Sequence, residues 1–147
     1  MLGEGFVHKC AWMSAASFLK KHLLIHYWYG EAHYMKYITA GDWAHNNAGW
    51  QWSAGCGCDA QPYFRIFNPI TQGKKFDPKG EIRRWVVELA HMPAPYICCR
   101  WQAPDSVLRN AGVCLGENYP LPVVNHPFAR NRFLQIAAEY LKHRILI

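Results

Sequence analysis

The sequence is short of acidic residues and contains no long apolar segment. Ten Asp and Glu residues stand against 16 Lys and Arg, which gives the 147-residue chain a formal net charge of +6. No segment approaches the roughly 20 apolar residues of a membrane-spanning helix, and the first residues lack the pattern of a secretory signal. We therefore expect an intracellular protein that is neither secreted nor membrane-bound, in the cytoplasm, nucleus or an organelle. The basic charge permits a polyanionic partner.

The usual metal and disulfide patterns are also missing. The six cysteines include a Cys56-x-Cys58 pair and the adjacent Cys98 and Cys99, and neither spacing is the C-x-x-C of a structural zinc site. Eight histidines are scattered without an H-E-x-x-H pair. Because the chain also lacks a secretory signal, we expect free thiols rather than disulfides, and we expect no bound metal.

The chain shows no internal repeat, no low-complexity segment and no linker, and its length suffices for a domain with its own core. We therefore expect residues 1–147 to form a single domain. Apolar residues at helical spacing predict a helix over residues 8–28 and a final helix over residues 126–144. Shorter helices are expected within residues 83–89 and from residue 102 to 108.

The first long helix and its end carry further expectations. Lys20, Lys21 and His22 are expected together on its solvated side. Gly30 is expected to break the run, and residues 31–37 then form a second helix. The apolar face of the final helix is expected to consist of Phe133, Ile136, Ala137, Tyr140 and Leu141.

The segment from Gly41 to Asp59 has an unusual composition, with three tryptophans and two adjacent asparagines. Asp42 is a good N-cap, and in a helix Asp42, Asn46 and Trp50 lie on one stripe, about 6 Å apart along the axis. A carboxylate, an amide and an indole then line one wall of the helix. On composition alone, the favoured interpretation is that the tryptophans are core residues and the asparagines are solvated.

A longer pattern changes this interpretation. Residues 42–52 read Asp-Trp-Ala-His-Asn-Asn-Ala-Gly-Trp-Gln-Trp, and Asp-Ala-Gln-Pro-Tyr-Phe-Arg-Ile-Phe-Asn-Pro and Gln-Gly-Lys-Lys-Phe-Asp-Pro follow from residues 59 and 72. Together these segments resemble the DNA photolyase and cryptochrome family, and within it the photolyases that repair cyclobutane pyrimidine dimers. The resemblance runs from about residue 6 to the final helix. It implies an all-α fold, the C-terminal portion of the family's helical FAD-binding domain, with long irregular loops.

The resemblance also implies a set of residues that face the flavin. Asn46 takes the place of the asparagine at flavin N5, Trp50 that of the flavin-proximal member of an electron-transfer chain, and Tyr27 that of its middle tryptophan. The implied catalytic residues are therefore Asn46, Trp50 and Tyr27. The implied cofactor-binding residues are Ala40, Gly41, Asp42 and Asn46.

Two charged residues of the family pattern are replaced together. Ala40 stands where the family has an aspartate near the flavin, and Trp12 stands where the family has the arginine that pairs with it. Losing both partners removes an ion pair without leaving a buried charge unpaired, which would be the costly case. The chain is therefore expected to fold, and to hold the flavin differently from the family or not at all.

A second implied set faces DNA and its lesion. Trp52 takes the place of a tryptophan that packs against the flipped pyrimidine dimer. Lys9 and Cys10 replace an asparagine and an arginine that contact the lesion strand, which is a departure from the family. The full set is Lys9, Cys10, Met13, Trp52, Arg65 and Gln72.

The resemblance implies a truncated homologue of a light-dependent, FAD-containing DNA photolyase. The α/β antenna domain of the family and the first half of its helical domain have no counterpart in the sequence, which argues against activity by the chain alone. FAD, DNA with a pyrimidine dimer, and a complementary chain that carries the missing half are the expected partners. Two alternatives stay open: a cryptochrome-like photoreceptor or interaction module, and a non-catalytic basic DNA-binding domain.

Overall fold

The computed structural model describes residues 5–39, 41–56, 65–77 and 80–144. In this part of the chain the secondary structure is helical, apart from one isolated bridge between Leu115 and Tyr119. The chain forms two compact units, Met1–Phe67 with Val124–Ile147 (unit 1) and Asn68–Val123 (unit 2). The all-α prediction is confirmed. The division into units does not test the expectation of a single domain, which stays a prediction.

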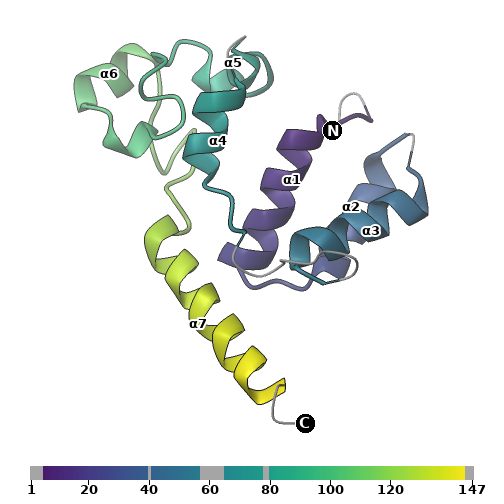
Figure 1. Ribbon diagram of the computed structural model, residues 1–147. Helices are drawn as coiled ribbons and strands as arrows, with labels where there is room; N and C mark the ends of the chain where they lie inside the picture. Colours follow the sequence, from purple (N-terminus) through teal and green to yellow (C-terminus); the bar gives the residue numbers. More distant parts are fainter. Residues whose placement is uncertain (1–4, 40, 57–64, 78–79, 145–147) are drawn as a thin grey trace. The chain divides into compact units, whose positions relative to one another are not determined.

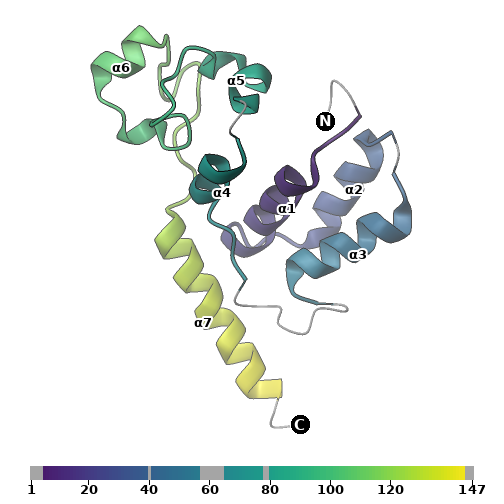
Figure 2. The same cartoon turned by 45° about the horizontal axis from the view of Figure 1, so that its top comes forward.

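Unit 1 contains the helices that carry most of the implied site residues. Helices α1, α2 and α3 pack together, with α2 and α3 side by side in both views (Figures 1 and 2). Its buried core consists of Ala16, Tyr34 and Trp50, one from each helix. The elements of unit 1 are α1 (Lys9–Ser17), the π-helix η1 (Phe18–His22), α2 (Tyr27–Tyr37), α3 (Trp43–Ala54) and α7 (His126–Arg144).

The prediction of one helix over residues 8–28 is wrong. The α-helical hydrogen bonding of α1 ends at Ser17, and the π-helix η1 follows it directly. Leu24 then adopts a left-handed conformation with φ 59°. A residue in this conformation cannot continue a right-handed helix, and a non-glycine residue rarely adopts it because its Cβ crowds the backbone. The side chain of His26 then accepts a hydrogen bond from Trp28 N and caps the start of α2.

Lys21 and His22 do not lie on a solvated side, and this expectation is also wrong. Lys21 is 2% exposed and His22 is 1% exposed. The Lys21 ammonium donates a hydrogen bond to the carbonyl oxygen of Arg65 (2.6 Å), and His22 Nε2 lies 2.7 Å from His126 Nδ1. The wider π-turn and the helices packed around it bury these side chains, which helical spacing alone does not predict.

Gly30 does not break the helix but lies inside α2. A Cβ atom at this position would overlap the indole ring of Trp50. Glycine here therefore allows the backbone of α2 to approach α3 closely, so the residue serves packing rather than a turn. Tyr34, one turn further along α2, is buried.

The final helix has the predicted bounds, His126–Arg144, but no residue of its predicted apolar face is fully buried. Ile136 and Tyr140 are 47% and 64% exposed, whereas Ala129 in the first turns is buried. The reason is that the contacts of α7 with η1 involve the first turns of α7, at His126 and Arg132.

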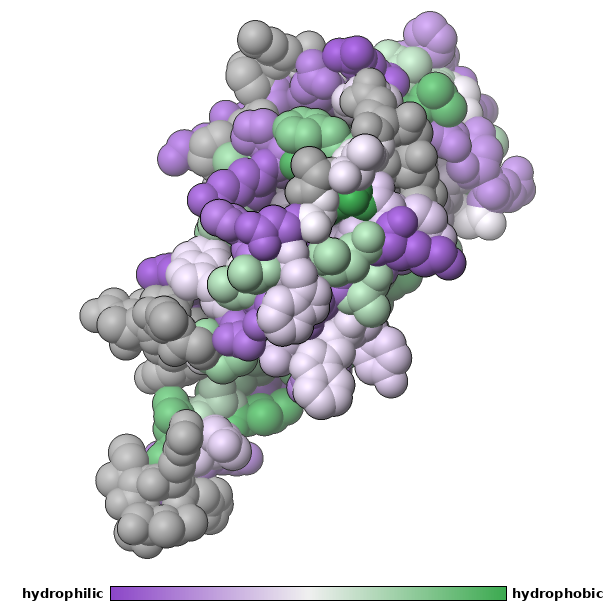
Figure 3. All heavy atoms as spheres, turned by 90° about the vertical axis from the view of Figure 1, so that its right-hand side faces the viewer, coloured by the Kyte–Doolittle hydropathy of each residue, from purple (hydrophilic) through white to green (hydrophobic). Residues whose placement is uncertain are grey.

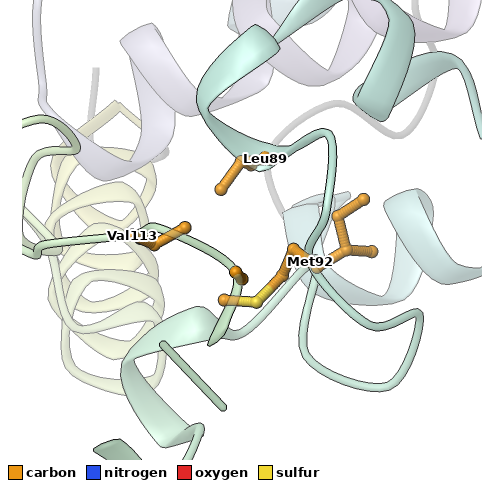
Figure 4. Close-up of a cluster of buried hydrophobic side chains, with 5 residues drawn as sticks. Leu89, Met92 and Val113 are labelled. Atoms are coloured by element: carbon orange, nitrogen blue, oxygen red, sulfur yellow. The ribbon is translucent and has the colours of Figure 1, made fainter. Parts of the chain in front are cut away.

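Unit 2 forms a separate small core. Leu89, Met92 and Val113 point toward one another in it (Figure 4), together with Ile97 and Ala111. Its elements are α4 (Pro69–Phe76), α5 (Glu81–Trp85), the 3-10 helices η2 (Val87–Leu89) and η3 (Arg100–Gln102), and α6 (Asp105–Asn110). Helix α4 was not predicted, and the expected helices within residues 83–89 and 102–108 are each divided into two short pieces.

Aromatic side chains lie on the surface of the described residues. Trp28 and Tyr29 of α2 and Trp43 of α3 are exposed. On the face shown in Figure 3, pale residues of intermediate hydropathy, the class that includes tryptophan and tyrosine, lie among hydrophilic ones. None of the helices in the described part of the chain has the length and apolar character needed to cross a membrane.

Candidate functional site

Three aromatic rings form the centre of unit 1. Trp50 is 1% exposed, and its ring lies 5.9 Å from that of Trp12 and 5.2 Å from that of Tyr34, centroid to centroid. All three rings meet edge to face, a favourable arrangement of aromatic quadrupoles. Trp12 packs so closely on α3 that a Cβ at Gly49 would overlap its ring. The indole at position 12 is therefore part of the core beside Trp50.

Asn46 lies one turn before Trp50 on α3 and is half-buried. Its Nδ2 donates a hydrogen bond to the carbonyl oxygen of Glu31 in α2 (3.1 Å). Because a carbonyl only accepts, this contact fixes which way the amide faces. No hydrogen bond to its Oδ1 is found among the described residues, so this oxygen is the atom left to accept one from a ligand.

The neighbouring asparagine is held by the side chain of the same glutamate. Asn47 Nδ2 donates to Glu31 Oε1 (2.8 Å), and Gln51 Nε2 donates to Asn47 Oδ1 (2.7 Å). Both asparagines are thus half-buried and hydrogen-bonded to α2. The interpretation of this helix as core tryptophans and solvated asparagines holds for Trp50, and it fails for the exposed Trp43 and for both asparagines.

Asp42 is exposed and caps α3, as the sequence predicts. Its Oδ1 accepts hydrogen bonds from Ala44 N (2.9 Å) and His45 N (3.4 Å), and Oδ2 lies 3.5 Å from His45 Nδ1. The backbone hydrogen bonds from His45 and Ala44 lower the pKa of this carboxyl group. Gly41 beside it is exposed, and Ala40 lies outside the described residues.

Tyr27 packs against the core cluster from the first turn of α2. Its ring contacts those of His26 (4.8 Å) and Trp28 (6.2 Å), and the Lys20 ammonium lies 5.5 Å from its centroid. Burial lowers the pKa of Lys20. Because Trp28 is exposed, the aromatic contacts lead from the core region to the surface.

The implied DNA-facing residues fall into three places. The guanidinium of Arg65 lies 4.8 Å from the ring centroid of Trp52, a cation–π contact. The first turns of α1 carry the exposed Lys9 and the half-buried Cys10 and Met13. Gln72 lies on α4 in unit 2.

The described residues contain no group of three His, Cys, Asp or Glu side chains arranged to hold a metal ion. Their cysteines, Cys10, Cys56, Cys98, Cys99 and Cys114, are free thiols, of which Cys99 is buried. Burial raises the pKa of the Cys98 thiol, which favours the neutral form. Cys58 lies outside the described residues.

A family model described as the FAD binding domain of DNA photolyase matches residues 1–139. The chain belongs to the DNA photolyase and cryptochrome family. The resemblance predicted from residues 42–78 is therefore confirmed, and FAD is the cofactor of this family.

Individual photolyases match most of this chain. It is 48% identical over 140 residues to the deoxyribodipyrimidine photo-lyase of Agrobacterium fabrum, and 48% identical over 137 residues to that of Escherichia coli. These matches cover 95% and 92% of the chain but only 29% and 27% of the relatives. The chain thus spans under a third of their length.

Solved structures show the same fold. A bacterial class III photolyase from Agrobacterium tumefaciens matches with a TM-score of 0.88 and 48% identity, over 94% of this chain and 29% of that one. A Synechocystis cryptochrome matches with a TM-score of 0.83 and 32% identity, over 90% and 27%. The prediction of a photolyase-type helical fold is confirmed.

The residues that the structure places on α3 fit an isoalloxazine ring at one point. A reduced flavin carries an N–H group at N5. Asn46 offers Oδ1 as an acceptor for it, because its Nδ2 already donates to the carbonyl oxygen of Glu31. The indole N–H of Trp50 is buried without a partner among the described residues. Both observations are compatible with a ligand on this part of unit 1.

Sequence reasoning missed the residues that hold the site together. Glu31 orients both asparagines, and Lys21 contacts the segment of Arg65. Neither has a sequence signal, because each acts across 15 or more residues of chain. Tyr34 could be found from its helical spacing, but its ring contact with Trp50 could not.

Proposed function

We propose that this chain binds FAD through unit 1 and serves the light-dependent repair of pyrimidine dimers in DNA. The observation that carries the proposal is the orientation of Asn46, whose Oδ1 faces away from Glu31 and is available to a ring N–H, one helical turn from the buried Trp50. Membership of the photolyase family supports it.

When bound, FAD supplies a light-driven electron to the dimer and recovers it after the ring has split. Asn46 would accept a hydrogen bond from flavin N5 and so orient the ring. Trp50 would donate electrons to the flavin from a site that excludes water, since it is 1% exposed. Tyr27 would follow it toward the surface, and its oxidation is coupled to the loss of its phenolic proton.

The DNA part of the proposal concerns Trp52 and Arg65. A dimer inside a duplex is out of reach, so the lesion has to be flipped out and held against the protein. The indole of Trp52 offers a stacking surface, and the Arg65 guanidinium beside it offers a positive charge for the DNA backbone.

The DNA part is tested by the affinity for an oligonucleotide with one thymine dimer, compared with the same strand undamaged. We expect Trp52→Ala to weaken binding to the damaged strand about tenfold, because stacking on one aromatic residue contributes about 1–3 kcal/mol. Trp43→Ala, which removes an exposed tryptophan from the other end of α3, serves as the matched control and should have little effect.

Two outcomes of this binding assay contradict repair. Equal binding of both strands, with a steep salt dependence, would favour the non-catalytic DNA-binding domain. Failure to bind either strand at low salt would favour the cryptochrome-like interaction module.

A further inference from the structure

Lys21 is a buried amine that the proposed chemistry does not use. It lies in η1, is 2% exposed, and donates a hydrogen bond to the carbonyl oxygen of Arg65 (2.6 Å). Its ammonium also lies 5.7 Å from the ring centroid of Phe133 in α7. A lysine is rarely buried this deeply, because removing an ammonium group from water is costly.

A second buried polar residue contacts the same segment one helical turn earlier. Ser17 is 2% exposed, and its hydroxyl oxygen accepts a hydrogen bond from Phe67 N (3.3 Å). Lys21 and Ser17 therefore hold two main-chain groups that are two residues apart, Arg65 O and Phe67 N. Two such contacts prevent the segment from rotating about its own axis.

This anchoring determines where the Arg65 side chain can reach. The Arg65 guanidinium lies 4.8 Å from the ring centroid of Trp52 on α3. Helix α3 in turn packs on η1, which carries Lys21. Fixing an arginine side chain costs rotamer entropy, so an exposed cation–π contact alone holds it weakly. A fixed backbone reduces the number of conformations in which the contact is lost.

We propose that Lys21 is a positioning residue that holds Arg65 against Trp52, so that the pair forms a preformed surface for an unstacked nucleobase and its phosphate. The positioning role follows from the contacts above. The identity of the ligand rests on the proposed function. A methionine could fill the same volume without a buried charge, but it could not donate to Arg65 O.

The positioning role is tested without DNA. The protein is labelled with 5-fluorotryptophan, and the ¹⁹F resonance of Trp52 is assigned by its absence in Trp52→Phe. We expect Lys21→Met to move this resonance in the same direction as Arg65→Gln does, because both remove the cation from the ring. Lys20→Met is the matched control, since Lys20 contacts Tyr27 instead, and it should leave the Trp52 resonance in place.

The proposal is overturned if Lys21→Met leaves the Trp52 resonance where it is while Arg65→Gln moves it, or if Lys20→Met moves it equally. Should Lys21→Met prevent folding, Ser17→Ala replaces it, because this variant removes the other contact to the segment and no charge. It should give a smaller change in the same direction, and an unchanged resonance would contradict the proposal.

A binding measurement separates this inference from the proposed function. We expect Lys21→Met to weaken binding to the thymine-dimer oligonucleotide about two- to fivefold, equivalent to one exposed cation–π contact, and to have no further effect in an Arg65→Gln background. Equal losses in both backgrounds would contradict positioning through Arg65. If the unsubstituted chain binds no DNA, the proposed function fails, while the ¹⁹F result still decides the role of Lys21.

Discussion

Replacing Gly30 with alanine is expected to lower the free energy of unfolding by about 1–3 kcal/mol, the usual cost of overpacking a core. The intrinsic helix propensity acts in the opposite direction, since alanine is favoured over glycine in a helix by about 1 kcal/mol. The steric effect should win, because the added Cβ would overlap the ring of Trp50, which is buried and held by Trp12 and Tyr34.

The sign of this effect should reverse when the ring is removed. In a Trp50→Leu background the shorter side chain leaves room for the Cβ, so Gly30→Ala should then stabilise the protein by about 0.5–1 kcal/mol. Urea unfolding followed by far-UV circular dichroism measures all four variants. An equal loss in both backgrounds would contradict the packing of α2 on α3, and a gain in both would show that Gly30 has no close neighbour.

Lowering the pH from 8 to 5.5 is expected to destabilise the protein through His22 and His126. Their facing nitrogens are 2.7 Å apart, and the rings stack with centroids 4.9 Å apart. The hydrogen bond between these nitrogens holds one proton, and protonation of both rings would place two N–H groups and two positive charges face to face. Positive groups already surround it, since Arg132 donates to His22 O (2.6 Å) and Lys21 precedes His22 in η1.

The pKa values give the sign of the effect. Burial is the first cause that lowers the pKa of both histidines, followed for His22 by the neighbouring His126 and for His126 by Arg130. The unfolded chain therefore binds more protons than the folded protein once the pH falls below the ordinary histidine value of about 6.5. Stability is then lost at up to about 1.4 kcal/mol per pH unit for each proton, and it is independent of these groups at pH 8.

This pH dependence is measured by urea unfolding at pH 8, 7, 6 and 5.5. His126→Gln should reduce the loss between pH 7 and 5.5 without abolishing it, because His126 no longer titrates while burial still lowers the pKa of His22. His91→Gln, an exposed histidine in unit 2, is the matched control and should leave the pH dependence unchanged. A protein whose stability is flat from pH 8 to 5.5, or whose slope in His126→Gln equals that of the unsubstituted chain, would contradict the histidine pairing.

Local signals in the sequence were sufficient for several elements. Asp42 caps α3 because its side chain accepts from the first backbone N–H groups, and Gly55 ends the helix in a left-handed conformation. The final helix was predicted with its observed bounds. Helix α4 also has a clear signal, since Asn68 caps it and Pro69 occupies its first turn, and attention to this Asn-Pro pair would have found it.

The remaining errors concern contacts between segments distant in sequence. Glycine is a weak helix former, so Gly30 suggests a helix end, and only the Trp50 ring on the facing helix explains its place inside α2. Lys21 and His22 are polar residues of the kind that usually face solvent. They are buried because they bond to Arg65 and His126, which lie 44 and 104 residues away in the sequence. No helical periodicity contains this information, because it is determined by which helices pack together.

For the site, the resemblance predicted a set of residues, and the structure shows which of them lie together. Trp50 and Tyr27 belong to one cluster of unit 1, Asn46 lies one turn before Trp50 on α3, and Trp52 contacts Arg65. The individual roles assigned to these residues remain predictions.

Titration of the purified chain with FAD, followed by flavin absorbance and fluorescence, tests the central claim most directly. Our account predicts saturable binding with a vibrationally structured blue absorption band. Asn46→Ala should weaken binding about tenfold, the upper value for one hydrogen bond, whereas Asn47→Ala should change it little. A chain that leaves the spectrum of added FAD unchanged, or an Asn46→Ala variant that binds FAD like the unsubstituted chain, would contradict the assignment of this face of α3 to the flavin.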